Sequence, residues 1–239
     1  MRTIRLFALL LTAGVIFQSI SLQAAKANDG RQTRQISGFH GISVSSGIDL
    51  YLTQKNVEEV FVEAKSDELD KIITEVEGGI LKIYMKDKSW PHIGWNNEPR
   101  KVYVSFKTLD KLHASAGSDV NSLSVLKLDN LDLDVSSGSD VKLELDTRDL
   151  RVQSSSGSDV SLKGKADVAA VSASSGSDII AGDLEIKKCS AHVSSGSDIN
   201  IRVTEEINAE ASSGGDITYS GNPKVKNIKE SSGGDVNGR

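Results

Sequence analysis

Hydrophobic and polar residues alternate strictly over much of the chain beyond residue 112. In one representative stretch the aliphatic residues occupy odd positions and the charged residues even ones: Leu131, Leu133, Val135, Val141, Leu143 and Leu145 against Asp132, Asp134, Asp140, Lys142 and Glu144. A period of two is typical of a β-strand with one buried face. The pattern therefore predicts strands that direct aliphatic side chains inward and polar side chains outward.

A short motif, Ser-Ser-Gly-Ser-Asp followed by Val or Ile, recurs between these strands. It is intact four times and has one variant before and two after, with aspartates at Asp119, Asp140, Asp159, Asp178, Asp198, Asp216 and Asp235. These aspartates are 21, 19, 19, 20, 18 and 19 residues apart. The glycine predicts a sharp bend, and the small residues on both sides of it are expected to point into that bend. One further copy, residues 45–49, stands apart from the array.

Repeats of nearly constant length predict stacking, because a single copy cannot bury its own apolar face. The fold class expected is all-β, a right-handed parallel β-helix (β-solenoid) of about seven regular rungs of 19–20 residues. Regular rungs are expected over residues 112–239. Residues 28–111, which include a hairpin signal at Glu77-Gly78-Gly79, are expected to form irregular rungs that cap the solenoid within one structural domain, 28–239.

The first 27 residues have the pattern of a signal peptide. Arg2 and Arg5 precede an apolar run, and small residues surround Lys26. The pattern predicts cleavage and export to the periplasm, the cell surface or the medium, with no membrane insertion after cleavage. Without these three cations the chain has 25 Lys and Arg against 33 Asp and Glu, a net charge of −8. Such acidity argues against nucleic acid as a partner.

The residue types that usually carry catalysis are sparse and scattered. Cys189 is the only cysteine, so no internal disulfide can form. It occupies an inward-facing position of the alternating pattern, which predicts a buried thiol. The four histidines match no metal-binding spacing: His40, His92, His113 and His192. No nucleophile elbow or phosphate-binding loop is present either. A non-enzymatic protein without a confident metal site is therefore expected.

The seven motif aspartates are the first candidate site. Because they occupy one position of each rung, they are expected to stack as a ladder along one corner of the solenoid. Two carboxylates about 4.8 Å apart repel by about 0.9 kcal/mol even in water, so the ladder needs compensation. Hydrogen bonds from serine hydroxyls and backbone N–H groups are one interpretation. Calcium or another surface cation is the other, since carboxylate oxygens are calcium ligands.

A second candidate is the segment that holds both tryptophans. Trp90 and Trp95 flank His92 within a few residues of two asparagines. Aromatic faces next to amides suit contact with a glycan. The alternative is that the tryptophans cover the end of the solenoid.

These features resemble a known family, the putative auto-transporter adhesin head GIN domain proteins. The resemblance lies in the signal peptide, the Ser-Gly-Ser-Asp array and three segments: residues 47–54, 60–64 and 79–83. It implies an exported protein of Gram-negative bacteria with a right-handed β-helix fold and a link to adhesion.

The favoured interpretation is an adhesin-like or envelope-binding solenoid that presents an acidic Ser/Asp surface to a glycan or a surface protein. The alternative is an envelope structural protein that forms homo-oligomers through the exposed edge expected at the C-terminal end of the solenoid. A third interpretation is an enzyme acting on polysaccharides, because parallel β-helices can host such activities.

Overall fold

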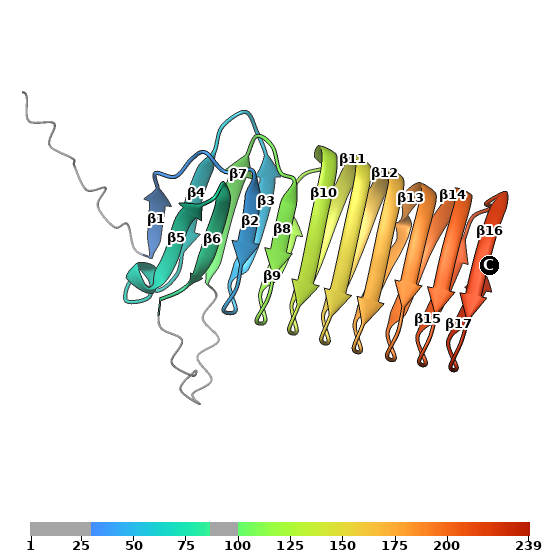
Figure 1. The fold of residues 1–239 in the computed structure, drawn as a ribbon. Coiled ribbons are helices and arrows are strands. Elements are labelled where there is room, and N and C mark those ends of the chain that lie inside the picture. The colour runs from blue at the N-terminus through green and yellow to red at the C-terminus, as the bar shows by residue number, and fades with distance from the viewer. Residues whose placement is uncertain (1–29, 87–99) are drawn as a thin grey trace, which may run out of the picture.

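The computed structural model describes residues 30–86 and 100–239, which form a β-solenoid of about seven turns (Figure 1). The predicted fold is confirmed. Its elements are β1 (Arg31–Arg34), β2 (Gly41–Val44), β3 (Asp49–Gln54), β4 (Glu59–Glu63), the 3-10 helix η1 (Leu69–Lys71), β5 (Ile72–Glu77), β6 (Ile80–Met85), β7 (Lys101–Phe106), β8 (Lys111–Ala114), β9 (Asp119–Ser122), β10 (Leu126–Ser136), β11 (Asp140–Ser155), β12 (Asp159–Ser174), β13 (Asp178–Val193), β14 (Asp198–Ala211), β15 (Asp216–Ser220), β16 (Val225–Glu230) and β17 (Asp235–Gly238).

Successive rungs pair in parallel with the motif copies in register. Asp140 lies opposite Asp159, and Asp159 opposite Asp178. The chain segments that run into the motif form one wall of the solenoid, here the first wall, and the segments that leave it form the second wall. The tight turns between the walls lie in one row along the lower edge of Figure 1.

The core lies between the two walls and consists of the aliphatic residues predicted from parity. Leu133 and Val152 face inward from the first wall, and Val141 from the second, all with no exposed surface. Cys189 is 2% exposed in the same core, as predicted. Burial raises the pKa of its thiol to about 12, so the thiol stays protonated and unreactive.

The tight turn departs from the expected parity at one position. Ser139 is buried as predicted, but Ser137 is exposed. Ser137 and Gly138 have φ angles of 58° and 68°, so two successive residues are left-handed. This conformation reverses the chain and swings the Ser137 side chain outward, whereas the parity argument assumed an extended backbone throughout the bend.

The motif copy at residues 45–49 belongs to the same row of turns, which corrects the expectation that it stands apart. Ser46 has a φ of 73°, and the Gly47 amide donates to the Ala116 carbonyl at 3.0 Å. The rung of β2 and β3 lies between the rung of β6 and β7 and the rung of β8 and β9, with parallel pairing on both sides. Strands β4 to β7 therefore lie on the N-terminal side of β2 and β3. The regular stack continues from β8 and β9 on the opposite side.

Antiparallel strands occupy the N-terminal end of the solenoid. β5 and β6 form the predicted hairpin, with Ile72 opposite Met85. On the second wall β4 pairs antiparallel with both β7 and β1. In the described ranges no helix is long and apolar enough to span a membrane.

Candidate functional site

The motif aspartates form the ladder predicted from the repeat. Register joins Asp119 to Asp140 and continues rung by rung to the last copy. Asp49 extends the ladder at its N-terminal end, because Leu50 pairs with Val120. We call these eight residues the aspartate ladder: Asp49, Asp119, Asp140, Asp159, Asp178, Asp198, Asp216 and Asp235.

Partial burial and the charges of neighbouring aspartates raise the pKa of three ladder carboxyls, those of Asp119, Asp159 and Asp198. Burial, then the charges of Asp140 and Asp178, raise the pKa of Asp159. Burial, then the charges of Asp178 and Asp216, raise the pKa of Asp198. Asp119 behaves in the same way beside Asp49, although Lys142 partly offsets the effect on its pKa. The ladder is therefore a line of like charges that disfavours full ionisation.

Among the described residues, no ladder carboxylate forms an ion pair or a hydrogen bond with a serine hydroxyl. The serine hydroxyls of the turn bond inward instead. The hydroxyl of Ser158 lies 3.0 Å from the Val135 carbonyl and 2.8 Å from the Ser155 carbonyl, and its oxygen accepts the Ser155 amide at 3.2 Å. Of the expected compensating partners, only backbone amides contribute, as the Asp178 amide does for Asp159.

Calcium binding by the ladder stays a prediction. Within residues 30–86 and 100–239, no three carboxylate, imidazole or thiol groups converge as a metal site would require. Calcium usually takes six to eight oxygen ligands. The ladder offers its carboxylates as neighbours in a line, which is a different arrangement.

The first wall compensates its outward charges across neighbouring strands. The imidazole of His113 lies 3.2 Å from the Asp134 carboxylate, and Arg151 lies 3.8 Å from Asp132. Farther along the stack Lys188 faces Glu206 at 3.9 Å. Such exposed pairs contribute about 0–1 kcal/mol each, but they leave this wall without a continuous charged line.

A row of aromatic side chains lies on the outer surface of the second wall, at its N-terminal end. Register places Phe61 opposite Tyr103 and Tyr103 opposite Tyr51. The ring centroids of Tyr51 and Tyr103 are 4.9 Å apart at an interplanar angle of 18°, and those of Phe61 and Tyr103 are 5.9 Å apart at 52°. All three are half-buried. We call these three residues the aromatic row.

Sequence reasoning missed the aromatic row, although a signal exists. Each ring is the middle residue of an aliphatic–aromatic–aliphatic triplet: Leu50-Tyr51-Leu52, Val60-Phe61-Val62 and Val102-Tyr103-Val104. In a strand with buried aliphatics, such a ring must point outward. The convergence of the three rings depends on the spatial order of β4, β7 and β3, which the triplets do not reveal.

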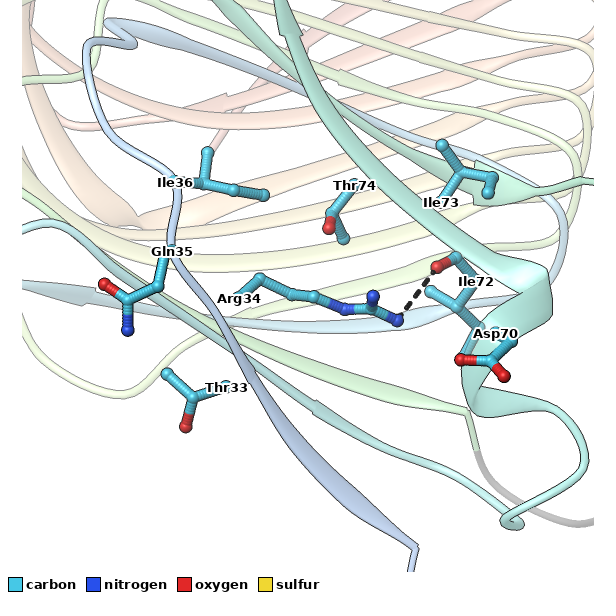
Figure 2. A pocket seen from close by; sticks show the side chains of 8 residues that line it. All are labelled: Thr33, Arg34, Gln35, Ile36, Asp70, Ile72, Ile73 and Thr74. Carbon is cyan, nitrogen blue, oxygen red and sulfur yellow. Dashed lines mark hydrogen bonds between the residues drawn. The ribbon is translucent and has the colours of Figure 1, made fainter. Parts of the chain in front are cut away.

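A pocket of about 340 Å³ opens at the N-terminal end of the solenoid, between β1 and β5 (Figure 2). The Arg34 guanidinium reaches across it and donates to the carbonyls of Leu69 at 2.7 Å and Ile72 at 3.4 Å. Its Nε is the only buried side-chain nitrogen or oxygen in the described residues that lacks a hydrogen-bond partner. Because this atom is enclosed, it is not offered to a ligand. Arg34 instead ties the two walls together at their open end.

The predicted glycan contacts Trp90, His92 and Trp95 lie outside the described residues, as does the predicted signal peptide. Both therefore remain predictions. The structure brings the other predicted site residues, the aspartates, into one continuous line.

Comparisons with known proteins show a family and a fold. The model of the family described as "Putative auto-transporter adhesin, head GIN domain" matches residues 38–223. A putative adhesin from Bacteroides fragilis superposes with a TM-score of 0.82 at 24% identity, covering 87% of this chain and 96% of its own. One from Parabacteroides merdae gives 0.69 at 18%, covering 87% and 95%. A protein from Parabacteroides distasonis described as a putative lipid binding protein gives 0.65 at 22%, covering 90% and 98%. No curated protein matches the chain.

Proposed function

Since the chain belongs to the putative auto-transporter adhesin, head GIN domain, family, we propose that it is an exported, non-enzymatic binding module of the cell envelope that acts as an adhesin. Its solenoid would hold a recognition surface rigidly away from the site of attachment. The second wall would be that surface, with the aspartate ladder and the aromatic row on its outer side.

The contrast between the unpaired aspartate ladder on the second wall and the cross-strand ion pairs found elsewhere on both walls carries this proposal. Charges on the first wall are paired across strands, as Arg151 is with Asp132. On the second wall the aspartate ladder has no ion pair in the part of the chain that the structure describes, and three rings stay half-exposed. Unpaired charge and exposed rings cost stability or solubility in an isolated protein, and such features mark interaction surfaces.

Binding of the purified chain to an array of glycans and extracellular matrix proteins tests the proposal. The array is probed once with calcium and once with a chelator. Selective binding supports a role in adhesion, and its loss on chelation would support calcium at the aspartate ladder. Absence of binding to every glycan and protein, together with release of reducing ends from a polysaccharide, would overturn the proposal in favour of an enzyme.

Self-association is a second candidate function, favoured by the strands at the C-terminal end. β16 pairs only with β14 in the described structure, and all six of its residues are exposed. An exposed strand edge can pair with another chain. Sedimentation over a range of protein concentrations tests this candidate, and a single monomeric species throughout would exclude it.

A further inference from the structure

From the geometry at the end of the aromatic row, we infer a binding site for a neutral glycan beside Tyr51. This inference rests on the proposed role in adhesion and names the class of ligand and its place. The site consists of the outward side chains of β3 and β9, where a large ring is followed by a small amide.

The ring of Tyr51 has one covered face and one that its neighbour leaves open. Tyr103 stacks on one side at 4.9 Å. On the other side Tyr51 lies opposite Asn121, a much smaller side chain, and both are half-buried. The outer surface therefore steps down from a ring to an amide within one rung spacing, about 4.8 Å.

Polar groups surround this step and are free to bind. A column is the set of side chains at the same position in successive rungs, and Asp49 belongs to the column next to that of Tyr51 and Asn121. In the described parts of the chain, neither the Asn121 amide nor the carboxylate of Asp49 makes a hydrogen bond. Lys142 follows Asn121 in the same column, and Asp119 lies one rung from Asp49. An apolar face next to donors and acceptors at fixed positions matches a sugar ring, which has C–H groups on its faces and hydroxyls around its edge.

Charge favours a neutral glycan over an anionic one. Three carboxylates lie along the step, those of Asp49, Asp119 and Asp140, against the ammonium groups of Lys142 and Lys101. The charge of Asp49 adds to burial in raising the pKa of Asp119, so these two neighbouring carboxylates already repel each other. A sialylated or sulfated glycan would add to this repulsion.

The competing explanation is that the aromatic row only stabilises the sheet, as cross-strand aromatic pairs do. The two tyrosines separate the explanations. Tyr103 has Phe61 on one side and Tyr51 on the other, so a ligand cannot reach its faces, whereas Tyr51 has the open face. Replacement of either ring removes the same stacking contact, but only Tyr51→Leu removes the surface offered to a sugar.

The test uses the purified full chain on an array of neutral, sialylated and sulfated glycans, with four variants. Tyr51→Leu and Asn121→Ala are expected to lower the affinity for a neutral glycan by about tenfold or more. Tyr103→Leu is expected to retain most of the binding. The matched control is Asn200→Ala, which lies in the same column between Ile180 and Thr218, several rungs from the aromatic row, and is expected to bind normally. Thermal unfolding of each variant separates lost binding from lost fold.

Two outcomes would overturn the inference. They are an array on which no neutral glycan binds, whether or not anionic glycans do, and binding that Tyr51→Leu and Tyr103→Leu reduce equally. Binding to a matrix protein with no neutral glycan bound would reject this site while leaving the proposed role in adhesion standing. Loss of binding to every glycan and protein would reject both.

Discussion

The N-terminal part of the solenoid and its regular stack share an inward face but differ in what they show to solvent. Leu50 in β3 and Leu133 in β10 are both fully buried. Each lies next to a copy of the left-handed turn: Leu50 follows the copy at Gly47, and Leu133 precedes the copy at Gly138. Outward, the column that holds Phe61, Tyr103 and Tyr51 continues as Asn121, Lys142, Ser161, Ile180, Asn200, Thr218 and Asn237. Inward positions therefore make the scaffold, and outward positions are left free to acquire a binding surface.

The largest effect is expected from removing one core leucine in each part of the solenoid. Leu50→Ala and Leu133→Ala should each lower the free energy of unfolding by about 3 kcal/mol, because each leaves a cavity in the same continuous core. Urea denaturation measures both. A much smaller effect of Leu50→Ala would show that residues 30–106 are not part of one cooperative unit with the stack. Asn200→Ala, at an outward position, serves as the control with little expected change.

The buried serine of the turn should matter almost as much as a core leucine. Ser158→Val removes a buried hydroxyl that bonds to Ser154, Ser155 and Val135, and it places a methyl group among their polar atoms. A loss of about 2 kcal/mol in the free energy of unfolding is expected. Ser156→Ala, two residues earlier and exposed, should stay within about 0.5 kcal/mol of the wild type. Equal effects at the two serines would contradict the inward role of Ser158.

The turn glycines should respond according to their backbone and surroundings. An added Cβ at Gly138 meets no atom within 4 Å, so Gly138→Ala should cost only the strain of a left-handed alanine, about 1 kcal/mol. A Cβ at Gly234 would lie 2.5 Å from the Ser212 amide nitrogen, so Gly234→Ala should cost more. Thermal unfolding of the two variants side by side checks this order. The reverse order would contradict the backbone assigned to the last turns.

The aspartate ladder should give the smallest effect and the only one that depends on pH. The pKa of Asp159 is raised in the folded protein above its ordinary value of 3.8, so its charged form destabilises the fold. This penalty is fully present above the folded pKa and is relieved as the pH falls toward 3.8. Asp159→Asn should therefore stabilise the protein by a few tenths of a kcal/mol near neutral pH, since solvent screens the exposed carboxylates.

Denaturant unfolding of Asp159→Asn and wild type across a range of pH measures this difference. The two stabilities should converge in acid. A gain that persists at low pH would show that the charge of Asp159 is not its cause, and a loss near neutral pH would show that the carboxylate has a stabilising partner.

The sequence predicted the solenoid because its signals are local and repeated. Leu133 and Val152 alternate with polar residues in adjacent copies, and the recurring aspartate fixes the register of the rungs. Parity failed at Ser137, since it cannot detect two successive left-handed residues. The place of β2 and β3 between two later rungs was also hidden, because it depends on pairing between segments far apart in the chain. The aromatic row follows from that same order, so it escaped for the same physical reason.

Mapping of the bound ligand onto the backbone tests most directly the division between scaffold and binding surface. The isotope-labelled chain is titrated with the neutral glycan that binds most strongly on the array, and backbone amide shifts are followed by NMR. We expect the shifts to concentrate in β3, β7 and β9, around Tyr51 and Asn121. Shifts confined to the first wall, or spread along the aspartate ladder from Asp140 to Asp235, would contradict it.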